Sequence, residues 1–164
     1  MTTRENLQNE LDYNPATGVF RWKRSWRGRN RNGGLAGTSV NGYWAINIDG
    51  RRFFAHRLAW FYMTGEWPPH DIDHIDGNPA NNAFANLRLA TRAENLGNSR
   101  LRKDNPVGLK GVIPKTQCGH TKYHARIRVD GEQRHLGSFD TPEEAHAAYV
   151  AKAAEVFGEF ARAA

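Results

Sequence analysis

Apolar and polar residues alternate along two stretches of the chain, residues 44–53 and 123–135, and an Asp-Gly pair interrupts each stretch. Alternation with a period of two is typical of a strand that buries one face, and Asp-Gly is typical of a tight hairpin turn. The sequence therefore predicts two β-hairpins. A further short strand is expected at Val19–Trp22, after a turn that contains Asn-Pro and Thr-Gly.

Elsewhere the apolar residues follow helical spacing. From about Ala55 they recur at helical intervals until Gly65, which predicts a helix between these residues. Thr91 is expected to cap a second, short helix. The segment 141–158 has the clearest signals, because it begins with a Thr-Pro-Glu-Glu capping box and ends at a glycine. Its many alanines form a smooth face that can lie close against a sheet.

These elements predict an α+β protein of two domains. Residues 101–108 are polar and include a proline, and we interpret them as a linker between a domain at 1–100 and a domain at 109–164. The second domain is expected to be a small sheet followed by one helix. The first is expected to begin with β-strands.

Composition narrows the function classes. The chain has 23 Lys and Arg against 17 Asp and Glu, a net charge of +6 and a pI near 9.8, which indicates a polyanionic partner. No apolar run approaches the ~20 residues that span a bilayer, and the N-terminus lacks the apolar core of a signal peptide, so no membrane partner and a cytoplasmic location are expected. Cys118 is the only cysteine, which excludes an internal disulfide and a multi-cysteine zinc site.

A basic segment lies between Arg21 and Arg31 and contains six cationic residues and no acid. Such a segment can follow phosphates without reading base sequence. Its candidate DNA-binding residues are Arg21, Lys23, Arg24, Arg27 and Arg29. The tryptophans of this segment are interpreted as core anchors, since aromatic residues are more often buried than used as stacking platforms.

The stretch DIDHIDGNPANN, residues 71–82, places a histidine among three aspartates directly before a turn. Three interpretations are open: a calcium loop, a catalytic metal site, or a polar loop. An EF-hand loop has glycine at its sixth position, and with Gly77 there its first and twelfth positions would be Ile72 and Ala83, neither of them a carboxylate. Phosphodiester hydrolysis needs an activated water and a cation, which the adjacent Asp73 and His74 suit.

Three segments, RRFFAHRLAW, DIDHIDGNPANNAFANLR and ATRAEN, resemble the His-Asn-His (HNH) endonucleases, in particular the phage and intron-encoded homing enzymes, over residues 11–98. The resemblance implies a small ββα-metal (His-Me finger) nuclease fold with one divalent cation. By this resemblance His74 is the general base, Asp73 is a metal ligand, and Asn86 ties the loop to the backbone and orients the base. Asn95 takes the place of the last His and is the second ligand.

The family is named for a histidine at the position that Asn95 occupies here, and we interpret the asparagine as a variant of the site. One carboxylate and one amide oxygen form a hard, sparse site that suits a single Mg²⁺, or Mn²⁺, completed by waters and a substrate phosphate. An imidazole at this position would favour softer ions.

Each of these residues also has a structural interpretation. Asp73 can cap a turn, and Asn95 can cap the end of a helix before Gly97. His56, in the His-Arg-Leu segment, is interpreted as a packed, hydrogen-bonded core histidine. Arg57 and Arg88 are candidates either for phosphate contacts or for ion pairs with nearby acids.

The segments GVIPK, KYHARIRV and HLGSFDTPEEAHAAYVAKAAEVFGEFA resemble the plant Apetala-type (ethylene-response-factor) DNA-binding domain over residues 107–161. That family lays a three-stranded sheet in the major groove with a helix behind it. The plant proteins carry Trp and more Arg on this face, so looser recognition is expected here. The resemblance implies a DNA-facing set of Lys115, His124, Arg126, Arg128, Gln133 and His135; alternatively, Arg126 and Arg128 are an ordinary solvated strand face.

Together these features predict a metal-dependent endonuclease that acts on double-stranded DNA in a bacterial or phage-infected cell and nicks it as a monomer, with a dimer as the alternative. A DNA-binding regulator with an inactive nuclease fold is the second hypothesis. A metal-binding structural protein is the third, and it explains the cationic strand face poorly.

Overall fold

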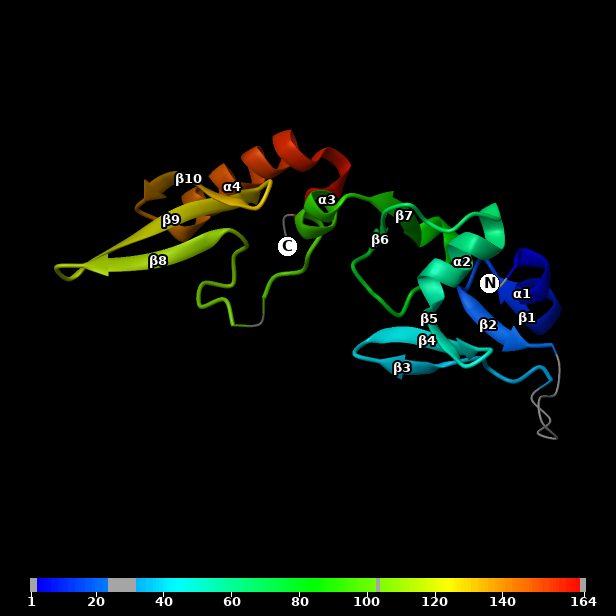
Figure 1. The fold of residues 1–164 in the computed structure, drawn as a ribbon. Coiled ribbons are helices and arrows are strands. Elements are labelled where there is room, and N and C mark those ends of the chain that lie inside the picture. The colour runs from blue at the N-terminus through cyan, green and yellow to red at the C-terminus, as the bar shows by residue number, and fades with distance from the viewer. Residues whose placement is uncertain (1–2, 24–31, 103, 163–164) are drawn as a thin grey trace. The chain divides into compact units, whose positions relative to one another are not determined.

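The computed structural model describes residues 3–23, 32–102 and 104–162, and it divides into two compact units, Met1–Leu89 and Ala90–Ala164 (Figure 1). It is a mixed structure of small sheets and few helices. The division into a nuclease domain at 1–100 and a DNA-binding domain at 109–164 stays a prediction. Within the described ranges, no helix combines the length and the apolar character needed to cross a bilayer.

The first unit contains two small antiparallel sheets, a third pair of strands and two helices. In chain order its elements are α1 (Arg4–Glu10), β1 (Leu11–Asn14), β2 (Val19–Trp22), β3 (Thr38–Val40), β4 (Tyr43–Ile48), β5 (Arg51–Phe54), α2 (Ala55–Thr64), β6 (Asp71–His74), a 3₁₀ turn (Phe84–Asn86) and β7 (Leu87–Ala90). The sheets have the orders β1-β2, β3-β4-β5 and β6-β7. The predicted first hairpin, the strand Val19–Trp22 and the helix before Gly65 are confirmed.

The hydrophobic core of the first unit is formed by residues from helices and strands throughout the unit. Its fully buried side chains include Leu7 of α1, Phe20 of β2, Ile46 of β4 and Leu58 of α2. Helix α1 was not predicted, because Leu7 is its only buried residue and a single apolar position gives no periodicity. The Thr3 hydroxyl caps its start by accepting a hydrogen bond from the Asn6 amide.

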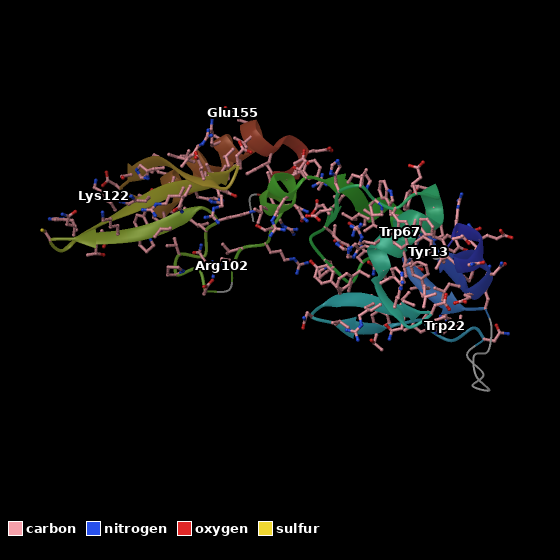
Figure 2. All side chains as sticks on the ribbon, viewed as in Figure 1. Tyr13, Trp22, Trp67, Arg102, Lys122 and Glu155 are labelled. Carbon is pink, nitrogen blue, oxygen red and sulfur yellow. The ribbon has the colours of Figure 1, made fainter. Side chains whose placement is uncertain are left out.

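The turn between β1 and β2 supports the loop that follows β6. Tyr13 of β1, labelled in Figure 2, donates its hydroxyl to the Asn82 carbonyl at 2.7 Å. The Phe84 amide donates to the Pro15 carbonyl at 2.9 Å. Gly18 has φ +73°, and a Cβ built there would lie 2.2 Å from the Asn82 carbonyl carbon. The two segments therefore touch backbone to backbone, which only glycine permits at this point.

The second unit is a three-stranded antiparallel sheet with a helix on one face, as the sequence predicts. Its elements are α3 (Arg92–Gly97), β8 (Val112–Gln117), β9 (His120–Val129), β10 (Glu132–Phe139), α4 (Pro142–Phe157) and a 3₁₀ turn (Gly158–Phe160), with sheet order β10-β9-β8. The predicted capping box of Thr141 and Glu144 is confirmed, and so is the end of α4 at Gly158.

Helix α3 belongs to the second unit through direct packing. A Cβ built on Gly97 would lie 2.7 Å from the Phe157 ring of α4. The Gly97 carbonyl accepts hydrogen bonds from the Arg162 amide and from the Lys110 ammonium. Thr91 caps α3 in a capping box with Glu94, which confirms the cap that the sequence predicts.

Replacing Gly18 by alanine tests the backbone contact beneath the Asn82 loop. Gly50 in the β4–β5 turn has nearly the same φ, +75°, but nothing lies within 4 Å of its built Cβ. Gly50→Ala should therefore cost only the left-handed strain of about 1–2 kcal/mol. Gly18→Ala should cost clearly more in urea unfolding, because the methyl group also displaces the loop. Equal losses in the two variants would contradict the contact.

Candidate functional site

Strand β6 buries three consecutive side chains at its end, Ile72, Asp73 and His74. Asp73 is 4% exposed and His74 is 6% exposed. Neighbouring side chains on a strand point to opposite faces, so both faces of this strand end are covered. The structure accordingly places Asp73 against Arg88 and His74 against Asn82 and His56.

Asn82 favours one tautomer of the neutral His74 ring. The Asn82 Nδ2 group donates to the Ala80 carbonyl at 3.1 Å, so its Oδ1 is the atom that faces His74 Nε2, at 3.4 Å. An amide oxygen only accepts hydrogen bonds, and the neutral imidazole therefore carries its proton on Nε2 and its lone pair on Nδ1. Asn82 is itself 3% exposed. A buried amide thus sets which ring nitrogen is basic.

Burial lowers the pKa of His74 below its usual value of 6.5, and this effect outweighs the Asn82 hydrogen bond and the carboxylates of Asp76 and Asp73, which all favour the charged ring. His74 is therefore neutral at neutral pH, as a proton acceptor must be.

Asp73 forms a buried ion pair with Arg88 of β7. The Arg88 Nε lies 2.9 Å from the Asp73 Oδ2, and the arginine side chain is 15% exposed. Of the two expectations for Arg88, the ion pair with an acid is the one that the structure shows. An ionised carboxylate in this place needs such a partner, because removing it from water is otherwise costly.

Asn86 holds the loop between β6 and β7 closed. Its Oδ1 accepts from the Asp76 amide at 3.0 Å, and its Nδ2 donates to the Asp76 carboxylate at 3.0 Å and to the Asn81 carbonyl at 2.9 Å. The backbone adds a bond from the Ile75 amide to the Asn86 carbonyl at 2.9 Å. This is the loop-tying geometry that the resemblance implies, and the exposed turn residue Asp76 is part of it. The catalytic role of Asn86 stays a prediction.

His56 differs from its predicted environment. It is buried, 8% exposed, but its Nδ1 has no hydrogen-bond partner among the described residues. Instead it packs with rings: Phe54 stacks on it at 5.7 Å between centroids, and His74 meets it edge to face at 5.2 Å. Tyr43 lies 5.7 Å from the His56 ring and 6.2 Å from the His74 ring. Burial, with smaller contributions from His74 and Arg57, lowers the pKa of His56 to about 3.

The other candidate residues of the first unit have structural partners. Arg57 donates to the carbonyls of Pro68 and His70, at 3.1 and 3.3 Å. Of its two expected roles, the ion pair with an acid is not seen among the described residues, and the phosphate contact stays a prediction. Both carbonyls belong to the loop before β6, where backbone oxygens need hydrogen-bond donors. Arg21 donates to the Gly33 carbonyl and Lys23 to the Gln8 carbonyl. The remaining candidates of the basic segment, Arg24, Arg27 and Arg29, lie outside the described residues.

In the second unit, Asn95 lies half-buried on α3. Its role as a second metal ligand stays a prediction. The predicted DNA-facing residues of the sheet share one face: Arg126 pairs with His135 and Arg128 with Gln133, and paired residues of antiparallel strands point to the same side. Lys115 pairs with Lys122, which Figure 2 labels on β9, and His124 pairs with Ile113. Helix α4 covers the opposite face through residues such as Ile127 and Tyr149.

The carboxylate of Asp73 is the type of donor that a hard divalent cation prefers, but in this structure it is paired with Arg88. Within the described ranges no group of three or more His, Cys, Asp or Glu is placed to hold a metal. A cation site at Asp73 would therefore be sparse, and the cation would compete with Arg88 for the carboxylate.

Asn82 is a candidate site residue that the sequence alone did not indicate. Its signal is the doubled asparagine at the end of DIDHIDGNPANN, but only the fold shows that the second one faces the imidazole. Tyr13 was missed for the same reason, since the residue that it supports lies far along the chain.

Comparison with known proteins identifies relatives of the chain. A family described as HNH endonuclease matches residues 53–96. Protein 3.8 of Escherichia phage T7 is 36% identical over 108 residues, which cover 65% of this chain and 87% of that protein. An uncharacterized HNH endonuclease of Acanthamoeba polyphaga mimivirus is 33% identical over 118 residues, covering 71% of this chain and 59% of that protein. No solved structure matches.

Replacing Arg88 by methionine tests the buried ion pair. Removing one partner leaves an uncompensated buried charge, so Arg88→Met should lower the free energy of unfolding by roughly 3–5 kcal/mol in urea titrations at pH 7. The double variant Arg88→Met with Asp73→Asn removes both charges and should recover much of that loss. A single variant as stable as the wild type would show that the pair does not neutralise Asp73.

Proposed function

This chain belongs to the HNH endonuclease family and is a nuclease, and from that premise we propose that it is a divalent-metal-dependent DNA endonuclease with His74 as its general base. The observation that carries the proposal is the buried, neutral imidazole of His74, whose proton the Asn82 amide holds on Nε2. A neutral imidazole has one nitrogen lone pair that can take a proton from the attacking water.

The loop after β6 positions this base. Asn86 and Asp76 hold the loop closed, and the closed loop carries Asn82 to the ring. Tyr13 and the β1–β2 turn support the same loop from the other side. A catalytic group is effective only when its geometry is held by surrounding contacts, and here the support is made of backbone and amide hydrogen bonds.

We propose Asp73 as a ligand of one Mg²⁺ or Mn²⁺, with Asn95 as the second ligand remaining the prediction made from the sequence. Both supply oxygen donors, and the remaining positions would be filled by waters and a substrate phosphate. A cation bound there would stabilise negative charge on the phosphate and on the departing 3′ oxygen, which leaves 5′-phosphate and 3′-hydroxyl ends. Arg88 neutralises the Asp73 carboxylate when no cation is bound and adds positive charge beside the phosphate when one is.

The second unit is proposed to hold the DNA. Its open sheet face carries Lys115, His124, Arg126, Arg128, Gln133 and His135, and a ribbon of this width fits the major groove, where arginine can reach guanine O6 and N7. The likeness to the Apetala-type domain remains part of this proposal. Arg57 and the basic segment that starts at Arg21 are proposed as further phosphate contacts.

One site cuts one strand, so the proposed product of a monomer is a nick. The relative from phage T7 makes a bacterial or phage-infected cell the proposed setting.

The first experiment is cleavage of supercoiled plasmid DNA with Mg²⁺, Mn²⁺ or EDTA. We expect nicking with either metal and none with EDTA, and His74→Ala should lose at least about 100-fold in rate, since a general base contributes at least that factor. The affinity of His74→Ala for DNA should stay within about twofold of the wild-type affinity. His70→Ala, an exposed histidine near the start of β6, is the matched control and should cut normally. Binding without cutting in any metal would favour the DNA-binding regulator.

A second experiment tests the sheet face. Arg126→Ala with Arg128→Ala should weaken binding of duplex DNA and reduce the slope of log K against log salt by about 2, because each lost phosphate contact removes about 0.9. Arg134→Ala is the control, since Arg134 pairs with Ile127 and so belongs to the helix-facing side of the sheet. An equal effect of Arg134→Ala would indicate a diffuse charge effect and not a binding face.

A further inference from the structure

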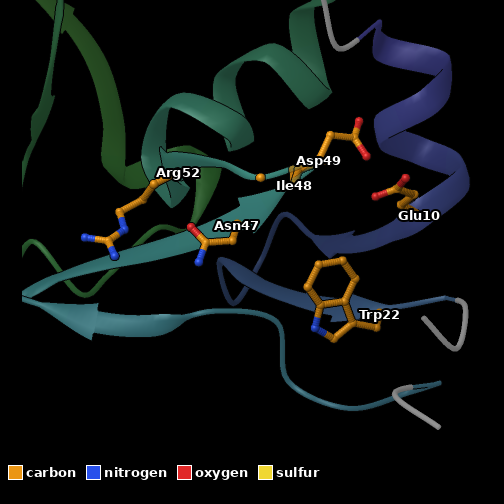
Figure 3. A pocket seen from close by; sticks show the side chains of 7 residues that line it. Glu10, Trp22, Asn47, Ile48, Asp49 and Arg52 are labelled. Carbon is orange, nitrogen blue, oxygen red and sulfur yellow. The ribbon is translucent and has the colours of Figure 1, made fainter. Parts of the chain in front are cut away.

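A polar cavity in the first unit has no role in the mechanism above. It measures about 590 Å³ and is lined by residues from α1, β2 and the β4–β5 hairpin. Figure 3 shows the Trp22 indole and the carboxylates of Glu10 and Asp49 to one side, with Asn47 and Arg52 to the other. Cavities of this size that combine one aromatic wall with a few polar groups are typical of small-molecule and cofactor sites.

Among the described residues that line the cavity, two carry carboxylates, Glu10 and Asp49, and one carries a guanidinium, Arg52. This lining disfavours a phosphate group. Carboxylate oxygens accept hydrogen bonds and repel anions. The chemistry that fits is a flat, uncharged ring that carries N–H donors.

Two residues of the cavity, Asn47 and Arg52, lie on the strand face that leads to the candidate site. Asn47 pairs with Arg52, and two residues along, about 7 Å at the rise of a strand, Ala45 pairs with Phe54. Paired and alternate residues share a face, so Asn47, Arg52 and Phe54 point to the same side of this sheet. Phe54 is 41% exposed and stacks on His56, and Tyr43 beside it is 40% exposed and lies 6.2 Å from the His74 ring.

We propose that this cavity binds a single nucleobase with an exocyclic amino group, displaced from the duplex beside the cut. The inference rests on the proposed DNA endonuclease function. Trp22 supplies the stacking face, as aromatic residues do in proteins that hold unpaired bases. Asn47, Glu10 and Asp49 read the base edge, since amides and carboxylates pair with the amino groups of adenine, cytosine and guanine. Thymine has no amino group and should be the poorest occupant.

The exposed rings of Tyr43 and Phe54 fit this arrangement. Apolar side chains next to a displaced base often fill the space that it leaves in the stack. Tyr43 and Phe54 lie between the cavity and His74. A base held in the cavity would therefore lie on the same sheet face as the reacting phosphate, and base recognition and chemistry would use neighbouring parts of one surface.

The test uses the full chain and the four free deoxynucleosides, which carry no phosphate and so avoid the cationic sheet face. Binding is followed by NMR at the Trp22 indole N–H, identified as the signal that Trp22→Leu removes. We expect millimolar binding of deoxyadenosine, deoxycytidine and deoxyguanosine, and at least about fivefold weaker binding of thymidine. Asn47→Ala, which changes an exposed residue and spares the core, should weaken the amino-bearing nucleosides at least about fivefold. Arg51→Ala, the neighbour of Arg52 on the opposite face of β5, is the matched control and should bind as the wild type does.

A second arm separates this proposal from the nuclease. His74→Ala should bind nucleosides like the wild type while failing to nick plasmid. Nicking that depends on His74 without nucleoside binding at Trp22 would overturn the cavity and leave the nuclease standing. Nucleoside binding at Trp22 without plasmid nicking would overturn the nuclease and leave the binding of nucleosides in the cavity standing. Equal binding of thymidine and the other three nucleosides would overturn the assignment to amino-bearing bases.

Discussion

Burial of a carboxylate and an imidazole on consecutive residues is the constraint on which the first unit depends. Asp73 and His74 end a strand that is covered on both faces, and neither side chain can be taken from water without a partner. Arg88 from the next strand meets the carboxylate, and Asn82 from the intervening loop meets the ring. Both partners come from the segment directly after β6, so closing the loop and satisfying the buried groups are the same event.

The loop can close only because several weak polar contacts act together. Asn86 bridges the Asp76 backbone, the Asp76 carboxylate and the Asn81 carbonyl, and each bond alone contributes about 1 kcal/mol. Beneath the loop, Gly18 permits an approach that any side chain would block. The N-terminal hairpin is therefore part of the site's support, although none of its residues reaches His74 in the described contacts.

Different surfaces of the chain carry different charges. The site is kept neutral or nearly so: burial keeps His74 and His56 uncharged, and Arg88 compensates Asp73. The sheet of the second unit collects cations on its open face, where phosphate is the natural partner. The described lining of the cavity beside Trp22 carries more carboxylates than cations. The site, the sheet face and the cavity therefore differ in chemical character.

The sequence alone determined the features that depend on local order. Alternation and the two Asp-Gly pairs were enough for the hairpins 43–54 and 120–139, and a capping box with a terminal glycine was enough for α4. The motif around His74 identified the family, because a catalytic motif is a short run of residues with fixed spacing. Local patterns could not reveal α1, which buries one leucine, nor a helix α3 that packs with α4 rather than with the strands before it.

Only the tertiary structure decided the partners of the buried polar groups. Asp73 and Arg88 were both candidates from sequence, but their pairing depends on how β6 and β7 align. Asn82 was hidden in a run of asparagines, and Gly18 lies 64 residues before it. Hydrogen bonds and backbone contacts between distant segments leave no periodic signal in the chain, because each is satisfied by one geometry and not by a repeating pattern. That is why the sequence was enough to suggest candidate residues, and the fold was needed to show which atoms they contact.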